Sequence, residues 1–338
     1  MCTDGLGCRP RVLGLLLALT VVGCEIQEIT IAEREDIVIA EAHLVVTRGF
    51  LDMPGGPQAT TTMTARVFLH RTFPGNPPIV PATVVVRAPG GAVSLALPQV
   101  GQEACRLFFL AEGQIPPPSG SCYRLELSPS PIPPGAAVEL DVLTDDGRRL
   151  TSTSTIPGDF ELVGLESGML DLPGGRLQRQ CLVRPGTRLR VAWTSSAEAW
   201  GYLGETVIVG LDEAIPEVDV PQELYLNGLA LRGDTTIVLP SDFLVFERFD
   251  LDREISLALQ EGMPLGTSAV VSISSLDRNW VNWARGGNFN PSGAVRIPSV
   301  FGEGTGVFGT AVRHEFMARA LDDPATLAQY PNCGPPEP

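Results

Sequence analysis

Residues 38–46 have the sequence VIAEAHLVV, and this stretch indicates the fold class. Every second residue from Val38 to Val46 is apolar, and Glu41 and His43 lie between them. Successive strand side chains point to opposite faces, so a period of two predicts a strand with one buried face. Similar runs follow at Val67–Leu69, Val93–Leu97, Tyr123–Leu127, Val138–Val142 and Leu150–Ile156. Because turn residues separate these runs, residues 36–157 are predicted to form an antiparallel β-sandwich of the immunoglobulin or fibronectin type III kind.

The second half predicts a further β-rich domain, over residues 158–320, with one short helix. Strand-like runs lie at 189–193, 205–209, 235–239 and 268–274. The helix is expected at Leu276–Arg285, with Ser274 as its cap and glycines 286 and 287 after its end. A glycine-rich segment over residues 286–309 then precedes a final strand at Thr310–Phe316, and residues 321–338 form a proline-rich tail.

The N-terminus has the pattern of a secretory signal peptide over residues 1–23. Arg9 and Arg11 precede the apolar stretch 12–22, which is shorter than the roughly 20 residues of a membrane-spanning helix. Val21-Val22-Gly23-Cys24 resembles the lipobox of bacterial lipoproteins, which predicts lipidation of Cys24. By the sorting rule of such lipoproteins, Glu25 indicates the outer membrane. Residues 24–35 would then form an acidic tether between the anchor and the folded part.

Four cysteines remain in the mature chain besides Cys24. They are Cys105, Cys122, Cys181 and Cys333, and an even number in an exported chain predicts two disulfides. Three pairings are possible, of which we favour Cys105–Cys122 and Cys181–Cys333. The spacings do not match a zinc site, so no metal is expected.

The composition excludes several classes of function. All 24 basic residues are arginine, and the chain has no lysine, which excludes P-loop, Schiff-base and Ser-Lys chemistry. A formal net charge of −15 argues against nucleic-acid binding, which needs a basic surface. The 36 glycines and 30 prolines argue against a helical bundle.

Three local patterns suggest chemistry but have simpler explanations. Gly304-x-Gly306-x-x-Gly309 matches a dinucleotide fingerprint, but a strand rather than a helix is expected after it, so turns or close backbone packing explain the glycines better. His43, His70 and His314 are scattered, and each is expected at the surface. Residues 250–254 (DLDRE) suggest a calcium site, but lack the glycine and distal glutamate of an EF-hand; a solvated acidic turn is favoured. No catalytic residue and no cofactor is predicted.

Aromatic residues of the second half are the best candidates for binding. The four tryptophans and Phe289, Phe301 and Phe308 lie there, and aromatic side chains on a β scaffold stack on sugars or anchor partner proteins. Trp193 is expected in the core, and docking of the helix is the simpler role for Trp280 and Trp283. The candidate ligand-binding residues are Trp280, Trp283, Arg278, Asn282 and Asn288.

Several features together resemble a known family of envelope proteins. These are the lipobox, the Tyr-x-Leu-x-Leu strand at 123–127, the exit Thr155-Ile156-Pro157, and Gly304-Thr305-Gly306-Val307-Phe308-Gly309. They are similar to the lipoproteins of domain-of-unknown-function family 4249 of Gram-negative bacteria, over about residues 36–316, although the segment 286–298 departs from the expected spacing.

The resemblance implies a lipid-anchored outer-membrane protein, periplasmic or surface-exposed, that acts as a non-catalytic binding or structural accessory. It implies another envelope protein as partner, such as a TonB-dependent transporter, and no functional residues. The alternative is a carbohydrate- or peptide-binding module that uses the aromatic second half. A hydrolase is the least favoured interpretation.

Overall fold

The protein is mainly β. The computed structural model describes residues 36–72, 81–105, 119–165, 168–172, 175–218, 220, 222–239, 255, 257–260, 262–285, 297–323, 325 and 333. The predicted signal peptide, Cys24, the tether and residues 250–254 lie outside these residues. Among the residues described, no helix is long and apolar enough to span a bilayer.

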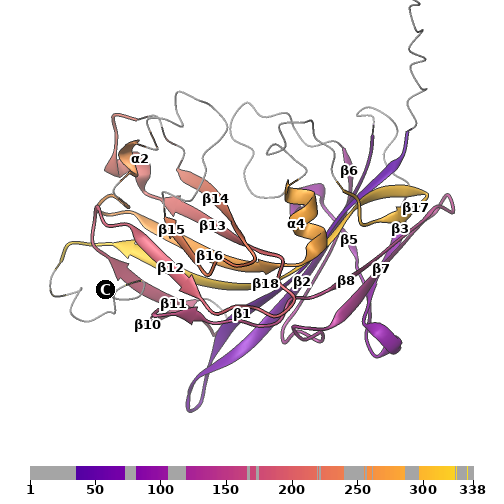
Figure 1. Ribbon diagram of the computed structural model, residues 1–338, viewed down its shortest axis with the longest axis horizontal. Helices are drawn as coiled ribbons and strands as arrows, with labels where there is room; N and C mark the ends of the chain where they lie inside the picture. The colour runs from indigo at the N-terminus through magenta and orange to yellow at the C-terminus, as the bar shows by residue number, and fades with distance from the viewer. Residues whose placement is uncertain are drawn as a thin grey trace, which may run out of the picture. The chain divides into compact units, whose positions relative to one another are not determined.

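The largest sheet has ten strands and draws them from both halves of the chain (Figure 1). Its order is β14-β13-β16-β18-β11-β1-β2-β6-β5, with β10 paired to β11. The strands are β14 (Glu223–Leu231), β13 (Gly201–Val209), β16 (Ser268–Leu276), β18 (Gly304–Ala320), β11 (Arg176–Val183), β10 (Gly168–Leu172), β1 (Val38–Met53), β2 (Gly56–Arg71), β6 (Gly120–Leu127) and β5 (Gln99–Val100).

Two smaller sheets and a few short helices complete the described part of the fold. The five-stranded sheet comprises β17 (Phe301–Gly302), β8 (Arg149–Thr155), β7 (Ala137–Thr144), β3 (Ala82–Arg87) and β4 (Ser94–Ala96), in that order. The three-stranded sheet comprises β15 (Thr236–Leu239), β12 (Leu189–Trp193) and β9 (Leu162–Val163). The helices are α2 (Leu211–Ala214), α4 (Arg278–Arg285) and the 3₁₀ turns η1 (Pro89–Gly91) and η2 (Gln102–Cys105).

The apolar face of β1 builds the core, as its alternation predicts. Ala42, Leu44 and Val46 are fully buried, in one cluster with Leu140 of the five-stranded sheet and Trp193 of the three-stranded sheet. Trp193 is therefore a core residue, as expected. The two smaller sheets thus share one continuous hydrophobic core with the large sheet.

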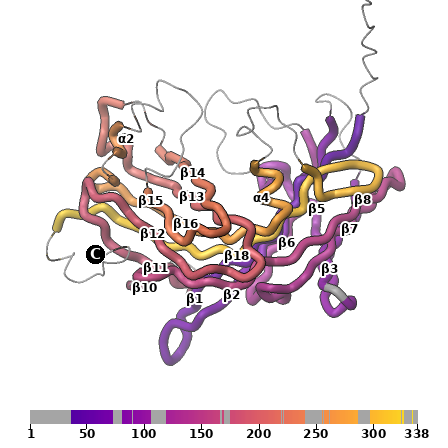
Figure 2. The backbone as a smooth tube through the Cα atoms, in the orientation of Figure 1, coloured from indigo at the N-terminus to yellow at the C-terminus, as the bar shows by residue number. Residues whose placement is uncertain are grey.

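The first and last strands of the described chain lie side by side. β1 and β18 pair in parallel, from Val38 opposite Gly304 to Arg48 opposite His314, and Figure 2 traces both through the centre of the large sheet. Asp36–Pro338 accordingly clusters as one compact unit. The boundary expected at residue 157 does not separate two sheets, because strands from each side of it hydrogen-bond to one another.

Local predictions and the structure differ in their details. The strands at residues 38–46, 123–127, 138–142 and 150–155 occur where the alternation predicts them. The final strand is longer than expected, because β18 begins at Gly304, inside the glycine-rich segment.

Both favoured disulfides are present, Cys105–Cys122 and Cys181–Cys333. The first joins η2 to β6, on the face of the large sheet opposite the main core, where Phe68 packs against it. The second joins residue 333 to β11, and the backbone N–H of Cys333 also donates to the carbonyl of Leu182 at 2.9 Å.

Candidate functional site

Two adjoining cavities form a groove between β8 and α4. Their volumes are about 380 and 390 Å³, and they share Thr153, Arg278 and Asn279. The first is also lined by Ala137, Val138, Glu139, Ser154, Thr155, Glu198, Trp200 and Asp277, and the second by Thr151, Ser152, Asn282, Ile297, Pro298, Ser299 and Phe301. Each volume lies within the range typical of small-ligand pockets. We call this region the β8–α4 groove.

Asp277 determines where α4 begins. Its Oδ1 accepts a hydrogen bond of 2.9 Å from the backbone N–H of Trp280, which is the N-cap arrangement. Ser274, the expected cap, instead lies in β16, where it pairs opposite Arg313 and accepts a hydrogen bond from its Nε. The prediction of the cap was wrong because pairing with β18 keeps the chain extended through Leu276.

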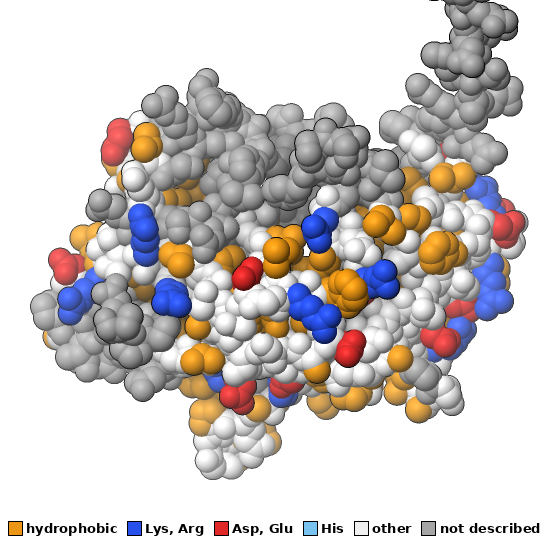
Figure 3. Space-filling view, in the orientation of Figure 1, with side chains coloured by type: hydrophobic (Ala, Val, Ile, Leu, Met, Phe, Trp, Pro, Cys, Tyr) orange, Lys and Arg blue, Asp and Glu red, His pale blue; other side chains and the backbone are white. Residues whose placement is uncertain are grey.

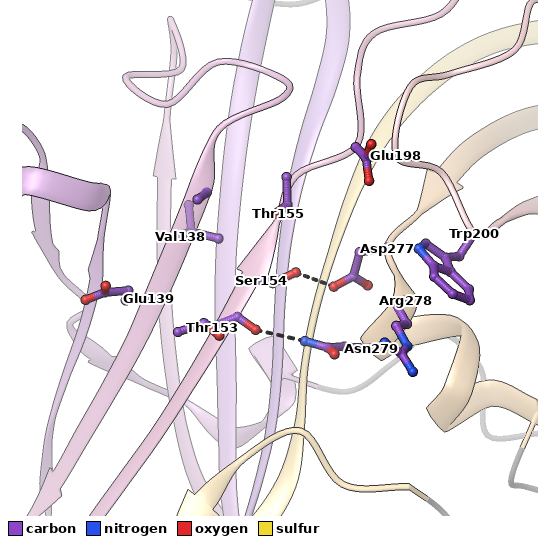
Figure 4. A pocket seen from close by; sticks show the side chains of 11 residues that line it. Val138, Glu139, Thr153, Ser154, Thr155, Glu198, Trp200, Asp277, Arg278 and Asn279 are labelled. Atoms are coloured by element: carbon purple, nitrogen blue, oxygen red, sulfur yellow. Dashed lines mark hydrogen bonds between the residues drawn. The ribbon is translucent and has the colours of Figure 1, made fainter.

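Side chains at the start of α4 attach the helix to β8. The hydroxyl of Ser154 donates to Oδ2 of Asp277, and Nδ2 of Asn279 donates to the carbonyl of Thr153 at 3.0 Å (Figure 4). The same Nδ2 donates to the carbonyl of Phe308, also at 3.0 Å. The hydroxyl of Thr310 donates to the carbonyl of Thr155 at 2.9 Å. One wall of the groove is therefore fixed relative to the other by hydrogen bonds.

Burial changes the acidity of Asp277. Loss of solvation raises the pKa of this carboxyl to about 6, although hydrogen bonds from Ser154 and from backbone N–H groups oppose the shift. Burial disfavours the ionised form of a carboxyl group, which is the physical cause of the rise. Asp277 therefore changes its charge in mildly acidic solution.

Two exposed aromatic side chains lie at different ends of the groove. Trp200 lines the first cavity and exposes 39% of its surface, and Phe301 lines the second and exposes 61%. The guanidinium carbons of Arg278 and Arg232 lie 5.0 and 5.8 Å from the centre of the Trp200 ring. Cation–π contacts of this kind hold an aromatic ring in place.

The structure brings two of the five predicted ligand-binding residues to the groove. Arg278 and Asn282 line it. Trp280 instead packs beneath the helix, with its ring 4.5 Å from that of His43, and Trp283 is half-buried on α4 and does not line either cavity. Asn288 lies outside the described residues. Docking of α4 thus accounts for Trp280, as the simpler interpretation expects.

Sequence reasoning missed much of the groove. Trp200 and Phe301 were candidates only as members of a larger aromatic set, Phe308 is buried, and Phe289 lies outside the described residues. Nothing pointed to Glu198 or to the threonines of β8. The exposed threonines alternate with more buried residues along β8, but only the packing of α4 beside that strand makes the threonines part of a cavity.

Two of the three histidines are buried, contrary to expectation, and the side chain of the third, His314, is only 12% exposed and packs against Phe160. His43 and His70 expose only 7% and 9%. Trp280 covers His43, and Phe68 stacks on His70 with ring centres 5.4 Å apart. The expectation was wrong because the second face of β1 and β2 is also covered. Burial, followed by the positive charge of Arg66, lowers the pKa of His43 to about 3, despite the opposing effect of Glu41.

The glycine motif serves backbone packing within β18. Gly304, Gly306 and Gly309 all lie in this strand, which continues to Ala320. Gly306 has a φ of +139°, and a Cβ there would meet the carbonyl oxygen of Ala40 at 2.0 Å. The prediction that a strand follows the motif is confirmed, and the strand–turn–helix context of a dinucleotide site is not present in this segment.

The remaining candidates and the comparisons add no further site. Residues 250–254 cannot be assessed, since they lie outside the described part of the chain. Within the part described, no three His, Cys, Asp or Glu side chains are grouped as metal ligands. Comparison with known proteins finds no matching family model and no curated relative.

Proposed function

We propose that this chain is an outer-membrane lipoprotein, anchored through Cys24, that acts as a non-catalytic binding or structural accessory of the cell envelope. The observation that carries the proposal is the disulfide pairing. The mature chain would have five cysteines, and the two disulfides use Cys105, Cys122, Cys181 and Cys333. Disulfides persist in exported proteins, and neither of the two disulfides uses Cys24. The lipobox assigns that cysteine to the acyl chains.

The proposed partner is another envelope protein, and the family resemblance favours a TonB-dependent transporter. The same resemblance supports an immunoglobulin-like sandwich for residues 36–157. β1, β2 and β6 share a core with β3, β7 and β8, which fits two packed layers, although β1 also joins the strands of the second half. The groove favours the alternative function, a carbohydrate- or peptide-binding module, because it combines exposed aromatic and polar side chains.

Metabolic labelling with a palmitate analogue tests the anchor. Wild-type protein should be labelled and recovered with outer membranes, whereas Cys24→Ala should lose the label and become extractable without detergent. Cys105→Ala is the matched control, since it removes a cysteine assigned to a disulfide and should retain the label. Equal labelling of wild type and Cys24→Ala would exclude lipidation at this position.

Crosslinking in intact cells tests the accessory function. A stoichiometric membrane protein that co-purifies with the tagged, lipidated chain is the expected result. Recovery of the chain alone would contradict the accessory function and favour a free binding module.

A further inference from the structure

We propose that the β8–α4 groove binds a neutral oligosaccharide. This inference rests on the proposed binding function, and it names the class of ligand. Three observations support it: the edge of β8 is closed to an added strand, exposed aromatic rings lie at both ends of the groove, and its lining combines polar and apolar groups with more acidic than basic side chains.

The edge of β8 distinguishes a sugar from an extended peptide. A peptide that adds a strand needs the backbone groups of an open sheet edge. β17 pairs with β8 only at Leu150 and Thr151, so residues beyond them have no neighbouring strand on this side. However, the carbonyls of Thr153 and Thr155 already accept hydrogen bonds from Asn279 and Thr310. Strand addition would have to break both contacts, so the groove favours a ligand recognised by side chains.

The aromatic rings suit the apolar faces of sugar rings. The face of an aromatic ring carries partial negative charge and attracts polarised C–H groups, which a pyranose presents on one side. Trp200 at one end and Phe301 at the other are both exposed. The guanidinium groups of Arg278 and Arg232 lie over the ring of Trp200, so a sugar would stack on the part of the indole that they leave open. Because these two aromatic rings lie apart, they favour a chain of several sugar units over a monosaccharide.

The polar lining suits hydroxyl groups. Thr151, Thr153 and Thr155 are exposed at alternate positions of β8, and the amide of Asn282 lines the same groove. Figure 3 shows arginine side chains beside hydrophobic and uncharged surface on the face seen in Figure 1. Hydroxyls and amides both donate and accept hydrogen bonds, as a polyhydroxylated ligand requires.

The charges favour a neutral sugar over an acidic one. Glu139, Glu198 and Asp277 line the first cavity with a single arginine, Arg278, and the whole chain has a net charge of −15. Like charges repel an anionic ligand on approach and in the site.

Glu198 has an unusual backbone conformation at the groove. Its φ is 59°, the only positive value among the non-glycine residues described. A side chain in the left-handed region costs folding free energy, and such residues cluster at binding sites. Figure 4 shows its side chain above Thr155 and Asp277.

Calorimetric titration of the full chain in detergent tests the proposal. The probes are cellohexaose, maltohexaose, xylohexaose and N-acetylchitohexaose, with a hexamer of galacturonate as the acidic comparison and an equimolar mixture of random nonapeptides as competitor. We expect at least one neutral hexamer to bind. Trp200→Ala and Phe301→Ala should each weaken it by about tenfold or more, because each removes an aromatic contact with the ligand.

Two further variants separate binding from folding. Leu231→Ala changes a side chain that is 55% exposed and does not line either cavity, so its affinity should equal that of wild type. Glu198→Gly relieves the positive φ, so it should fold at least as stably as wild type yet bind more weakly.

Four outcomes would overturn the proposal. They are no binding of any neutral hexamer, tighter binding of the galacturonate hexamer, displacement of the bound hexamer by the peptides, and affinity unchanged in both Trp200→Ala and Phe301→Ala. The titration does not depend on lipidation or on a membrane partner. Loss of the anchor in the labelling experiment would therefore leave this result intact, and the two proposals fail separately.

Discussion

Gly309 shows how one missing side chain positions a helix. A Cβ at this residue would lie 2.9 Å from Cβ of Trp280, and Trp280 is held against His43. Glycine is less favourable than alanine in a strand interior, so a local argument alone would favour substitution here. The contact with α4 reverses that expectation.

Gly309→Ala should therefore destabilise the protein by about 1–3 kcal/mol, the range typical of overpacking. Urea unfolding at neutral pH measures the change. The matched control is Gly233→Ala. The added Cβ would meet nothing within 4 Å there, so this substitution should change the stability little. Equal effects of the two substitutions would mean that Trp280 does not restrict residue 309.

His43 links the buried polar face of β1 to the pH dependence of folding. Burial keeps the ring neutral, with a pKa of about 3, whereas an unfolded histidine has a pKa of about 6.5. As the pH falls below about 6.5, the unfolded chain takes up a proton that the folded chain does not. Stability from His43 is thus present above that pH and is lost toward pH 3.

His43→Phe keeps a ring against Trp280 and removes this titration. Relative to wild type, the variant should lose roughly 2–3 kcal/mol less stability between pH 7 and pH 4.5. Chemical unfolding at a series of pH values measures the difference. Parallel curves for the two proteins would show that His43 is not kept neutral by burial.

At the scale of elements, α4 depends on Asp277 in two ways. This residue caps the helix and accepts a hydrogen bond from the Ser154 hydroxyl. Burial raises the pKa of its carboxyl to about 6. The folded carboxyl then holds a proton that the unfolded chain releases. Stability from this group is greatest below about pH 4 and decreases as the pH rises through about 6.

Two substitutions separate the cap from the titration. Asp277→Ala should cost about 1–2 kcal/mol at pH 7, because it removes the acceptor for the Trp280 N–H. Asp277→Asn keeps an acceptor oxygen, so it should lose less than half as much and should flatten the change between pH 4 and pH 6. Unfolding curves at both ends of this range measure both effects, and an asparagine variant with the wild-type pH dependence would contradict the raised pKa.

The elements themselves were predictable to different degrees. The alternation of apolar and polar residues located β1, β6, β7 and β8, because a strand with one buried face has an apolar side chain at every second position. The start of α4 was misplaced, because Ser274 and Asp277 are both good caps and pairing with β18 decides between them. Of the groove, only Arg278 and Asn282 were named as ligand-binding residues, with Trp200 and Phe301 in the wider aromatic set, because the residues of β8 enter it through the packing of a distant helix.

At the scale of the whole molecule, the pairing of β1 with β18 joins the two expected domains. β1 hydrogen-bonds to β2 on one side and, along Val38–Arg48, to β18 on the other. A fragment of residues 36–157 lacks β18 and would expose that edge of β1. Unpaired strand edges favour association with other chains.

We therefore expect the fragment 36–157 to fail to fold as a soluble monomer, whereas the chain from residue 36 to residue 338 does so. Circular dichroism, size-exclusion chromatography and limited proteolysis compare the two. A monomeric, protease-resistant fragment with a cooperative unfolding transition would restore an independent first domain.

The sequence by itself determined the β class, most strand positions and the even cysteine count that predicts two disulfides, whereas the structure decided among the three possible pairings. The features that the sequence determined depend on local periodicity or on counting residues. Only the tertiary structure decided that the first and last strands pair, that His43 and His70 are buried, and that β8 and α4 enclose a groove. These features arise from contacts between residues that are distant in the chain, more than a hundred positions apart for β1 with β18, His43 with Trp280 and β8 with α4. Such contacts leave no regular period in the sequence and form only when the sheets pack.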